Sequence, residues 1–123
     1  MNHLLHHFFT RVAARNPDHV AVDMPPAGGR PRELVSYGAL DRWSNGVAHA
    51  LGPFVHGESV VAMLLPRGAS AYATELGILR AGAAYTCLDA SFPDARARLV
   101  LDDAAAVALV TDEEGRRRAG AQD

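Results

Sequence analysis

Residues 58–88, ESVVAMLLPRGASAYATELGILRAGAAYTCL, decide the fold of this chain. They begin with a continuous apolar run over 58–65, β-branched at its start, which is typical of a strand buried on both faces of a parallel sheet. We expect a helix to begin at Ser70 and to close at Gly82, since glycine readily adopts the left-handed conformation that ends helices. A second apolar run over 84–88 predicts another short buried strand. The stretch therefore predicts one β-α-β unit of a parallel sheet.

A further helix and strand are expected downstream. Residues 91–94, SFPD, fit a capping box, in which the Ser91 side chain meets unpaired amides and Asp94 lies three residues on. Pro93 then lies in the first turn of the helix, where its missing N–H costs nothing. AVALVT (106–111) predicts a strand. The apolar positions of the helix repeat with helical spacing and are Ala97, Val100, Leu101 and Ala104.

Upstream, the pattern predicts an amphipathic helix, a hairpin and a second helix. The first helix stops before Pro17. HVAVDM (19–24) and ELVSY (33–37) predict two strands joined across the proline- and glycine-rich loop of 25–32. Ser36 is the expected N-cap of the second helix. The expected buried stripes are Leu5, Phe8, Phe9 and Val12 in the first helix, Leu40, Trp43, Val47 and Leu51 in the second, and Tyr72, Leu76, Leu79 and Ala83 in the third.

From residue 33 onward, the expected elements alternate as β-α-β-α-β-α-β. Such alternation predicts an α/β fold of αβα layers, in which right-handed crossovers join parallel strands and helices lie on the sheet faces. The N-terminal helix and the hairpin precede this part. We assign residues 1–111 to one domain and residues 112–123 to a polar C-terminal end.

The composition limits the class of protein. The chain has 123 residues, 49% of them hydrophobic, as expected for one packed domain or part of one. A formal net charge of −2 argues against binding to nucleic acid or to an anionic membrane. No apolar run approaches the roughly 20 residues that span a bilayer, and the N-terminus shows no signal-peptide pattern. The single cysteine, Cys87, excludes a disulfide framework and favours a reducing, cytoplasmic setting.

Every basic residue of the chain is an arginine, and lysine is absent. A mechanism that needs a lysine amine, such as a phosphate-loop lysine or a Schiff base, is therefore impossible within this chain. Neither a GxGxxG nor a GxxxxGK[ST] pattern occurs. Gly28 and Gly29 belong to the hairpin loop and do not lie between a strand and a helix.

Ligands of a doubly wound sheet bind beyond the C-terminal ends of its strands. Arg67, Asp89 and the residues after Thr111 are expected there. Arg67 has the charge to meet an anion, but we favour a surface residue or a partner of Asp89. Asp89 has no histidine or second acid nearby in sequence, so we expect a structural carboxylate that accepts backbone amides.

The remaining reactive residue types have structural interpretations. His3 and His7 are spaced i, i+4, with His6 beside them, but no further ligand is evident and we expect no metal site. Cys87 lies in an apolar strand, which predicts a buried, inert thiol. We expect three serines, Ser36, Ser70 and Ser91, to be helix caps. We expect the aromatic residues Trp43 and Tyr72 to be core residues.

Three segments of the chain, in unbroken order, resemble the beginning of adenylate-forming enzymes, the AMP-dependent synthetases and ligases. FFTRVAARNPDHVAVD (8–23) resembles their usual lead-in, and LVSYGALDRWSNGVAHAL (34–51) resembles their "LTYxELxxxxNxLAxxL" segment. Residues 58–112 resemble the next segment, written around "LKAGxAYVPLDPxxPxxR", through AGAAY, the following LD and the downstream proline and arginine. The resemblance is closest to amino-acid adenylation domains of nonribosomal peptide synthetases.

This resemblance implies an incomplete, N-terminal portion of an enzyme that uses ATP and magnesium. In the family, a carboxylate attacks the α-phosphate of ATP to give an acyl-adenylate and pyrophosphate, and the acyl group then passes to a thiol, typically of a carrier protein. The family's ATP-gripping loop, substrate pocket and catalytic lysine come later in its sequence and match no position here. The resemblance therefore assigns no catalytic, cofactor-binding or metal-binding residue to this chain. We expect a framework that is inactive as a lone chain, with the remainder of an adenylation domain or a carrier protein as its partner.

The chain departs from the family pattern at three positions. Ala39 stands where the family usually has a glutamate, three residues after the Ser36 cap, so the helix start should be weaker by about 1 kcal/mol. Cys87 and Ala90 replace common prolines, which loosens the chain around Asp89.

Two other functions stay open at this point. A stand-alone binding or interaction domain could reuse the scaffold, because an incomplete sheet leaves an apolar edge that another chain could cover. An unrelated doubly wound domain, such as a receiver-type module, would place clustered acids at its strand ends. Only Asp89 and Asp112 occupy such places here.

Overall fold

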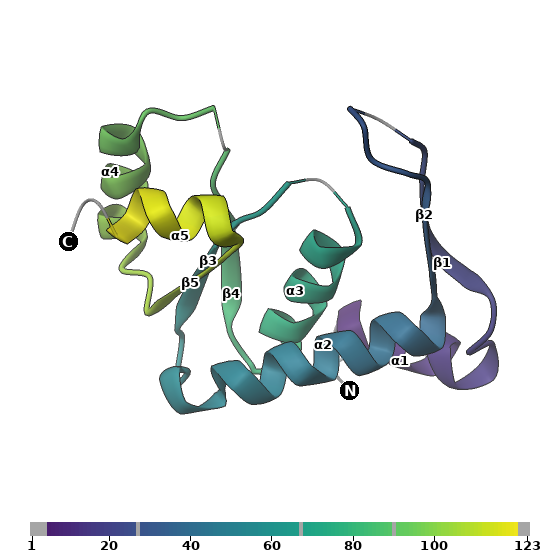
Figure 1. The fold of residues 1–123 in the computed structure, drawn as a ribbon. Coiled ribbons are helices and arrows are strands. Elements are labelled where there is room, and N and C mark those ends of the chain that lie inside the picture. The colour runs from purple at the N-terminus through teal and green to yellow at the C-terminus, as the bar shows by residue number, and fades with distance from the viewer. Residues whose placement is uncertain (1–4, 27, 67, 90, 121–123) are drawn as a thin grey trace.

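The apolar run that opens the β-α-β unit becomes the central strand of a three-stranded parallel sheet (Figure 1). The computed structural model describes residues 5–26, 28–66, 68–89 and 91–120. The elements follow in the order α1 (Leu5–Arg15), β1 (Val20–Met24), β2 (Glu33–Ser36), α2 (Tyr37–Leu51), β3 (Val60–Leu64), α3 (Ala69–Arg80), β4 (Ala84–Cys87), α4 (Asp94–Ala104), β5 (Ala108–Thr111) and α5 (Glu113–Gly120). A short 3₁₀ turn, Gly52–Phe54, follows α2.

The strand order β4-β3-β5 confirms the predicted parallel α/β sheet. Val61 of β3 is paired with Tyr85 of β4 on one side and with Ala108 of β5 on the other. Val61 and Ala62 have no exposed surface, because β3 has a strand on each side and protein on both faces. The continuous apolar sequence of this strand follows from that burial.

The structure corrects the place of β2, which the alternating pattern put in the parallel sheet. β2 pairs only with β1, antiparallel, in a separate two-stranded sheet. The predicted hairpin across the loop of 25–32 is thereby confirmed. The helix pair α2–α3 stands between this hairpin and the parallel sheet (Figure 1), so β2 has no strand of that sheet within reach.

Two apolar cores lie on either side of the helix pair. The first joins one face of the parallel sheet to the helices and is built on Val61, Met63 and Ile78. The second lies under the hairpin and joins β1 to α2 and α3. Its buried members are Val22, Leu40, Ala69 and Ala73.

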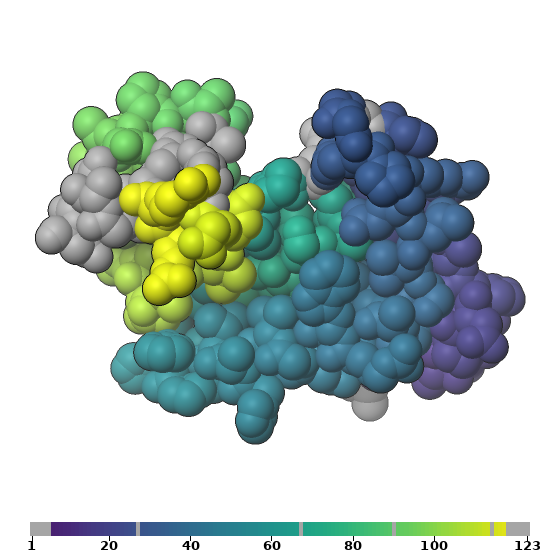
Figure 2. All heavy atoms as spheres, in the orientation of Figure 1, coloured from purple at the N-terminus to yellow at the C-terminus, as the bar shows by residue number. Residues whose placement is uncertain are grey.

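The other face of the parallel sheet is turned toward the C-terminal helices. Leu64 Cδ2 lies only 3.2 Å from the position that a Cβ atom on Gly115 of α5 would occupy. The predicted stripe of α4 is half-buried, whereas Asp102 and Asp103 are exposed. In Figure 2, α4 and α5 (green and yellow) form one projecting part and the hairpin (blue) forms another, with α2 and α3 (teal) between and below them.

The buried face of α3 differs from the predicted stripe. Small residues face α2: Ala73 is fully buried and Gly77 is buried against Val47 and Ser44. Because the two helices approach so closely there, the contact face is rotated and Tyr72 is left 42% exposed.

The stripe of α1 is also displaced from its predicted positions. Phe8 and Val12 are 52% and 37% exposed, while His6 and Ala13 are buried. Phe9 packs partly against the second core, as expected. The guanidinium of Arg11 lies 5.6 Å from the centre of the Phe8 ring, which provides that ring with a neighbour at the surface.

Local sequence rules locate two helix ends correctly. Ser36 Oγ accepts a hydrogen bond of 3.1 Å from the Ala39 amide at the start of α2, as the N-cap prediction requires. Gly82 has φ 89° after α3, where the amide of Ala83 donates to the Ile78 carbonyl at 3.1 Å. This is the left-handed closure that the glycine predicted.

Substitution of the N-cap should weaken the fold measurably. We expect Ser36→Ala to lower the free energy of unfolding by about 1 kcal/mol, because the Ala39 amide loses its acceptor. Ser36→Asp, which restores an acceptor, should recover most of that loss. Urea unfolding followed by circular dichroism measures both variants, and equal stability of the alanine and native proteins would contradict the capping role.

The predicted caps at Ser70 and Ser91 are wrong. Ser70 lies inside α3, and the helix start is capped by Glu33 of the hairpin, whose Oε1 accepts the Ala69 amide at 3.0 Å. α4 begins after Pro93, which occupies the N-cap position, and makes no side-chain capping bond. The Ser91 hydroxyl donates to Asp89 Oδ1 instead, at 2.8 Å.

The polar end over 112–123 contains a helix that the sequence did not predict. Asp112 Oδ1 accepts the Gly115 amide at 2.9 Å and so caps α5. An acid followed by two further acids suits a helix N-terminus, because the helix dipole favours negative charge there. Among the described residues, no helix is both long enough and apolar enough to cross a membrane.

Candidate functional site

The strand ends, where the topology would place a ligand, carry carboxylates that are engaged locally. Asp89 Oδ1 accepts the Ser91 amide at 2.9 Å, and this hydrogen bond, with that of the hydroxyl, lowers the pKa of Asp89. Thr111 donates to the Leu64 carbonyl at 2.7 Å, joining the ends of β5 and β3. The prediction that Asp89 accepts backbone amides is confirmed. The other predicted residue of this edge, Arg67, lies outside the described residues.

The histidines near the N-terminus lie together but form no evident metal site. The rings of His6 and His7 are 4.4 Å apart, and His3 lies outside the described residues. Burial, together with His7 and Arg80, lowers the pKa of His6. No group of three or more histidine, cysteine, aspartate or glutamate side chains in the described part of the chain is arranged to hold a metal ion. The absence of a metal site from the whole chain stays a prediction.

Three predicted core residues are at the surface. Trp43 and Tyr72 are each 42% exposed, and Cys87 is exposed because β4 is an edge strand. Burial, and secondarily Glu75, raises the pKa of the Cys87 thiol, which keeps its thiolate fraction low. The thiol is therefore accessible, contrary to the prediction, but it is not activated.

A polar cluster holds the three N-terminal helices together. The Arg80 guanidinium of α3 donates to Thr10 Oγ1 of α1 at 2.7 Å and to the Asp41 carbonyl of α2 at 3.1 Å. It also contacts the Asp41 carboxylate and the Asn45 side chain. The Phe9 ring lies 5.7 Å from the guanidinium. The side chain of Arg80 is only 10% exposed, so its partners neutralise a largely buried charge.

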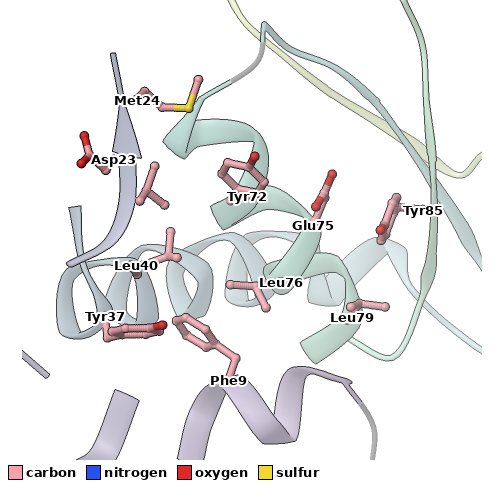
Figure 3. A pocket seen from close by; sticks show the side chains of 12 residues that line it. Phe9, Asp23, Met24, Tyr37, Leu40, Tyr72, Glu75, Leu76, Leu79 and Tyr85 are labelled. Carbon is pink, nitrogen blue, oxygen red and sulfur yellow. The ribbon is translucent and has the colours of Figure 1, made fainter. Parts of the chain in front are cut away.

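The best candidate for a binding site is an apolar pocket of about 490 Å³ between the hairpin and the parallel sheet. Its volume falls in the range of small-ligand sites. α3 forms its floor with Tyr72, Glu75 and Leu76, β1 forms one wall with Met24, and Tyr85 of β4 forms the opposite wall (Figure 3). α1 and α2 close the remaining side. The hairpin, three helices and an edge strand therefore build one concave surface.

One unbalanced carboxylate lies in this pocket. Figure 3 shows Glu75 on α3 between Tyr72 and Tyr85. Burial raises the pKa of Glu75, and Glu75 in turn is the largest cause that raises the pKa of Tyr85. Asp23, the other acid of the pocket, is paired with Arg32 by two hydrogen bonds of 2.9 and 2.8 Å. The pocket thus presents one net negative charge among aromatic and aliphatic side chains.

The raised pKa of Glu75 predicts a pH-dependent stability. A carboxyl group whose pKa is higher in the folded protein stabilises the fold only where it is protonated, so the native protein loses that contribution as the pH rises above the unfolded-state value. We expect Glu75→Gln to be at least as stable as the native chain at pH 7. The stability difference should disappear near pH 4.

Urea unfolding at both pH values measures this difference. Glu58→Gln is the matched control, because Glu58 is exposed and lies outside the pocket. A glutamine variant at position 75 that is less stable than the native chain at pH 7 would contradict the assignment of an unpaired, partly desolvated carboxylate.

Sequence reasoning did not find this pocket. Glu75 lies within the third predicted helix, and its neighbours come from segments as distant as Phe9 and Tyr85. The available indication was the one acid of the helix, which lies between Tyr72 and Leu76. Such an acid on a half-buried face indicates a polar contact that the local sequence does not supply.

The comparisons with known proteins all identify the same family. Residues 9–123 match the family model described as "AMP-binding enzyme". The chain is 36% identical over 115 residues to chondramide synthase cmdD of Chondromyces crocatus. It is 42% identical over 108 residues to CymA of Salinispora arenicola, a probable non-canonical nonribosomal peptide synthetase. These alignments cover 89% and 87% of this chain but 3% and 1% of the relatives, so the chain spans a small fraction of the length of the proteins that it matches.

Solved structures show the same similarity. The chain superimposes on the nonribosomal peptide synthetase FmoA3 with a TM-score of 0.80 and 29% identity, over 94% of this chain and 12% of FmoA3. FmoA3 has also been solved with AMPPNP bound, with the same TM-score and 30% identity, and with α-methyl-L-serine-AMP bound. The α/β architecture described above is therefore that of a segment of these synthetases.

Proposed function

Because this chain belongs to the AMP-binding enzyme family, we propose that it is the N-terminal framework of an amino-acid adenylation domain and does not catalyse adenylation as a lone chain. The observation that carries this proposal is the continuous family match over residues 9–123 in a chain that has no lysine. In this proposal residues 1–111 form the framework part, and α5 over Glu113–Gly120 begins the polar end.

The proposed reaction of the complete domain has two steps. A substrate carboxylate oxygen attacks the α-phosphorus of ATP, and the bond to pyrophosphate breaks, so that an acyl-adenylate forms. A carrier thiolate then attacks the acyl carbon, and AMP leaves with its phosphate oxygen. The AMPPNP and α-methyl-L-serine-AMP forms of FmoA3 support ATP and an amino acid as the reactants.

The described strand ends present no evident magnesium site. The strand-end carboxylates of Asp89 and Asp112 each accept a local backbone amide, of Ser91 and Gly115, through Oδ1. No group of metal-ligating side chains is available among the described residues. We therefore propose that ATP and magnesium bind to the remainder of the domain.

What this chain contributes in the proposal is geometry. The Arg80 cluster and the close contact between α2 and α3 hold the helices together, and the two apolar cores join the parallel sheet and the hairpin to them. A remainder that docks on this unit meets a rigid surface, which is the property that a catalytic scaffold requires. We place this framework in the cytoplasm, in agreement with its single cysteine.

Amino-acid-dependent ATP–pyrophosphate exchange tests the proposal. We expect the purified chain to give background exchange with each of the 20 standard amino acids and with α-methyl-L-serine, because its residues supply neither a phosphate loop nor an ammonium group. FmoA3 with α-methyl-L-serine is the positive control. Exchange by the lone chain above the background of a boiled sample would refute the proposal.

A further inference from the structure

Large apolar side chains that line the pocket between the hairpin and the parallel sheet are exposed to solvent. Tyr72 is 42% exposed and Tyr85 is 39% exposed, and both line the pocket. Clustered exposed apolar residues mark a surface that another part of a protein covers.

The charge of the pocket specifies what covers it. Asp23 is neutralised by Arg32, whereas burial is the cause that shifts the pKa of Glu75 and no described basic side chain forms a salt bridge with it. A further apolar cover over Glu75 alone would leave a buried, unpaired carboxylate, which is strongly unfavourable. A cation on the cover supplies the counter-charge that Glu75 lacks within the described residues.

The comparisons indicate where such a cover comes from. This chain aligns with FmoA3 over 94% of its own length but over only 12% of FmoA3. A protein of this architecture therefore has a large body of further polypeptide that can lie against the segment. We propose that the remaining part of the adenylation domain covers this pocket with an apolar segment that carries one lysine or arginine, whose cation pairs with Glu75. This inference rests on the proposed function.

A lysine or arginine side chain suits the pocket in shape as well as in charge. Its aliphatic stem can lie along Leu76 and Leu79 while its cationic end reaches the Glu75 carboxylate. The rings of Tyr72 and Tyr85 flank that carboxylate and attract a cation through their faces (Figure 3). One cation is enough to balance the net charge of the pocket, because Asp23 is already paired with Arg32.

The test is a binding measurement between this chain and truncated FmoA3, which lacks the segment that this chain matches. Tagged chain is co-purified with truncated FmoA3, and the dissociation constant is then measured by titration. We expect a complex with the native chain and an affinity at least about 30-fold lower with Glu75→Gln, which leaves the partner's cation buried without its carboxylate. Glu75→Arg should abolish the complex through repulsion.

Two matched controls separate the pocket from the rest of the surface. Glu58→Gln removes an exposed charge elsewhere and should change the affinity less than twofold. Tyr72→Ser should weaken the complex at least about tenfold, whereas Trp43→Ser should not, although Trp43 and Tyr72 are equally exposed. Glu75→Gln removes an unfavourable charge from the free chain, so we expect the variant to fold, and its circular dichroism spectrum and melting temperature check this.

Each outcome is decisive. No complex with the native chain, or equal affinity of the native and Glu75→Gln chains, would overturn the inference. So would self-association of the lone chain that Tyr72→Ser abolishes, because the pocket face would then bind a second copy. A Glu75-dependent complex without ATP–pyrophosphate exchange would support the inference and count against the proposed function. If the complex catalyses exchange but substitution of Glu75 and Tyr72 does not change its affinity, the proposed function would be supported and the inference would be contradicted.

Discussion

Gly77→Ala is expected to lower the free energy of unfolding by about 3 kcal/mol. A Cβ atom at position 77 would lie 2.5 Å from Val47 Cβ and 2.9 Å from the Ser44 carbonyl oxygen. Neither neighbour can turn away, because one is backbone and the other is a branch point fixed to its helix. The helices α2 and α3 would have to separate, which opens both apolar cores.

Gly46→Ala is the matched control for this prediction. Gly46 lies in α2, and nothing lies within 4 Å of its added Cβ. Alanine is the better helix former, so we expect Gly46→Ala to raise the free energy of unfolding by about 0.5–1 kcal/mol. Urea unfolding measures both variants. If Gly77→Ala were as stable as the native chain, the close approach of α2 and α3 would be wrong.

Asp41→Ala is expected to lower the free energy of unfolding by about 2 kcal/mol. The substitution leaves the Arg80 guanidinium, with a side chain that is 10% exposed, without its counter-charge. Removing one partner of a buried ion pair costs about 3–5 kcal/mol, and we expect less here because Asp41 is itself 31% exposed. In the variant Arg80 also keeps its hydrogen bonds to Thr10 and to the backbone carbonyl at position 41.

The double variant separates the stranded charge from lost packing. Arg80→Met alone leaves Asp41 with access to water and should cost about 1 kcal/mol. Adding Asp41→Ala to Arg80→Met should then cost little more, because no buried charge remains. Thermal unfolding of the three variants gives the comparison. A double variant that is less stable than Asp41→Ala by the full cost of Arg80→Met would show that the two residues act independently.

The parts of the fold that could be predicted are those that local sequence controls. The run over 58–65 indicated β3, because a strand buried on both faces has no polar positions. Ser36 and Gly82 indicated helix ends, because each acts on backbone groups within a few residues. The family resemblance extended these local inferences to the whole chain, and the comparisons confirmed it.

The parts that could not be predicted depend on distant contacts. The cap of α3 comes from Glu33, 36 residues before the Ala69 amide that it accepts, so the serine at position 70 was the wrong choice. Trp43 and Tyr72 are exposed because small residues such as Gly77 bring α2 and α3 together on another face. The spacing of apolar residues in the sequence does not show which face of a helix contacts a neighbouring helix.

The pocket belongs to this second group. Its walls come from the hairpin, three helices and an edge strand, and their arrangement is a property of the tertiary structure. Glu75 was visible in the sequence as the one acid of its helix, but its lack of a cationic partner was not. For the same reason the exposure of Cys87 was missed, because an apolar strand sequence does not distinguish an edge from the centre of a sheet.

The most direct measurement of the central claim is amino-acid-dependent ATP–pyrophosphate exchange in truncated FmoA3 to which this chain is added. We predict background exchange from either polypeptide alone and exchange with α-methyl-L-serine from the mixture, because one supplies the framework and the other the reactive groups. Exchange by the added chain alone, or a mixture that stays at background, would contradict the assignment of this chain as the framework of an adenylation domain.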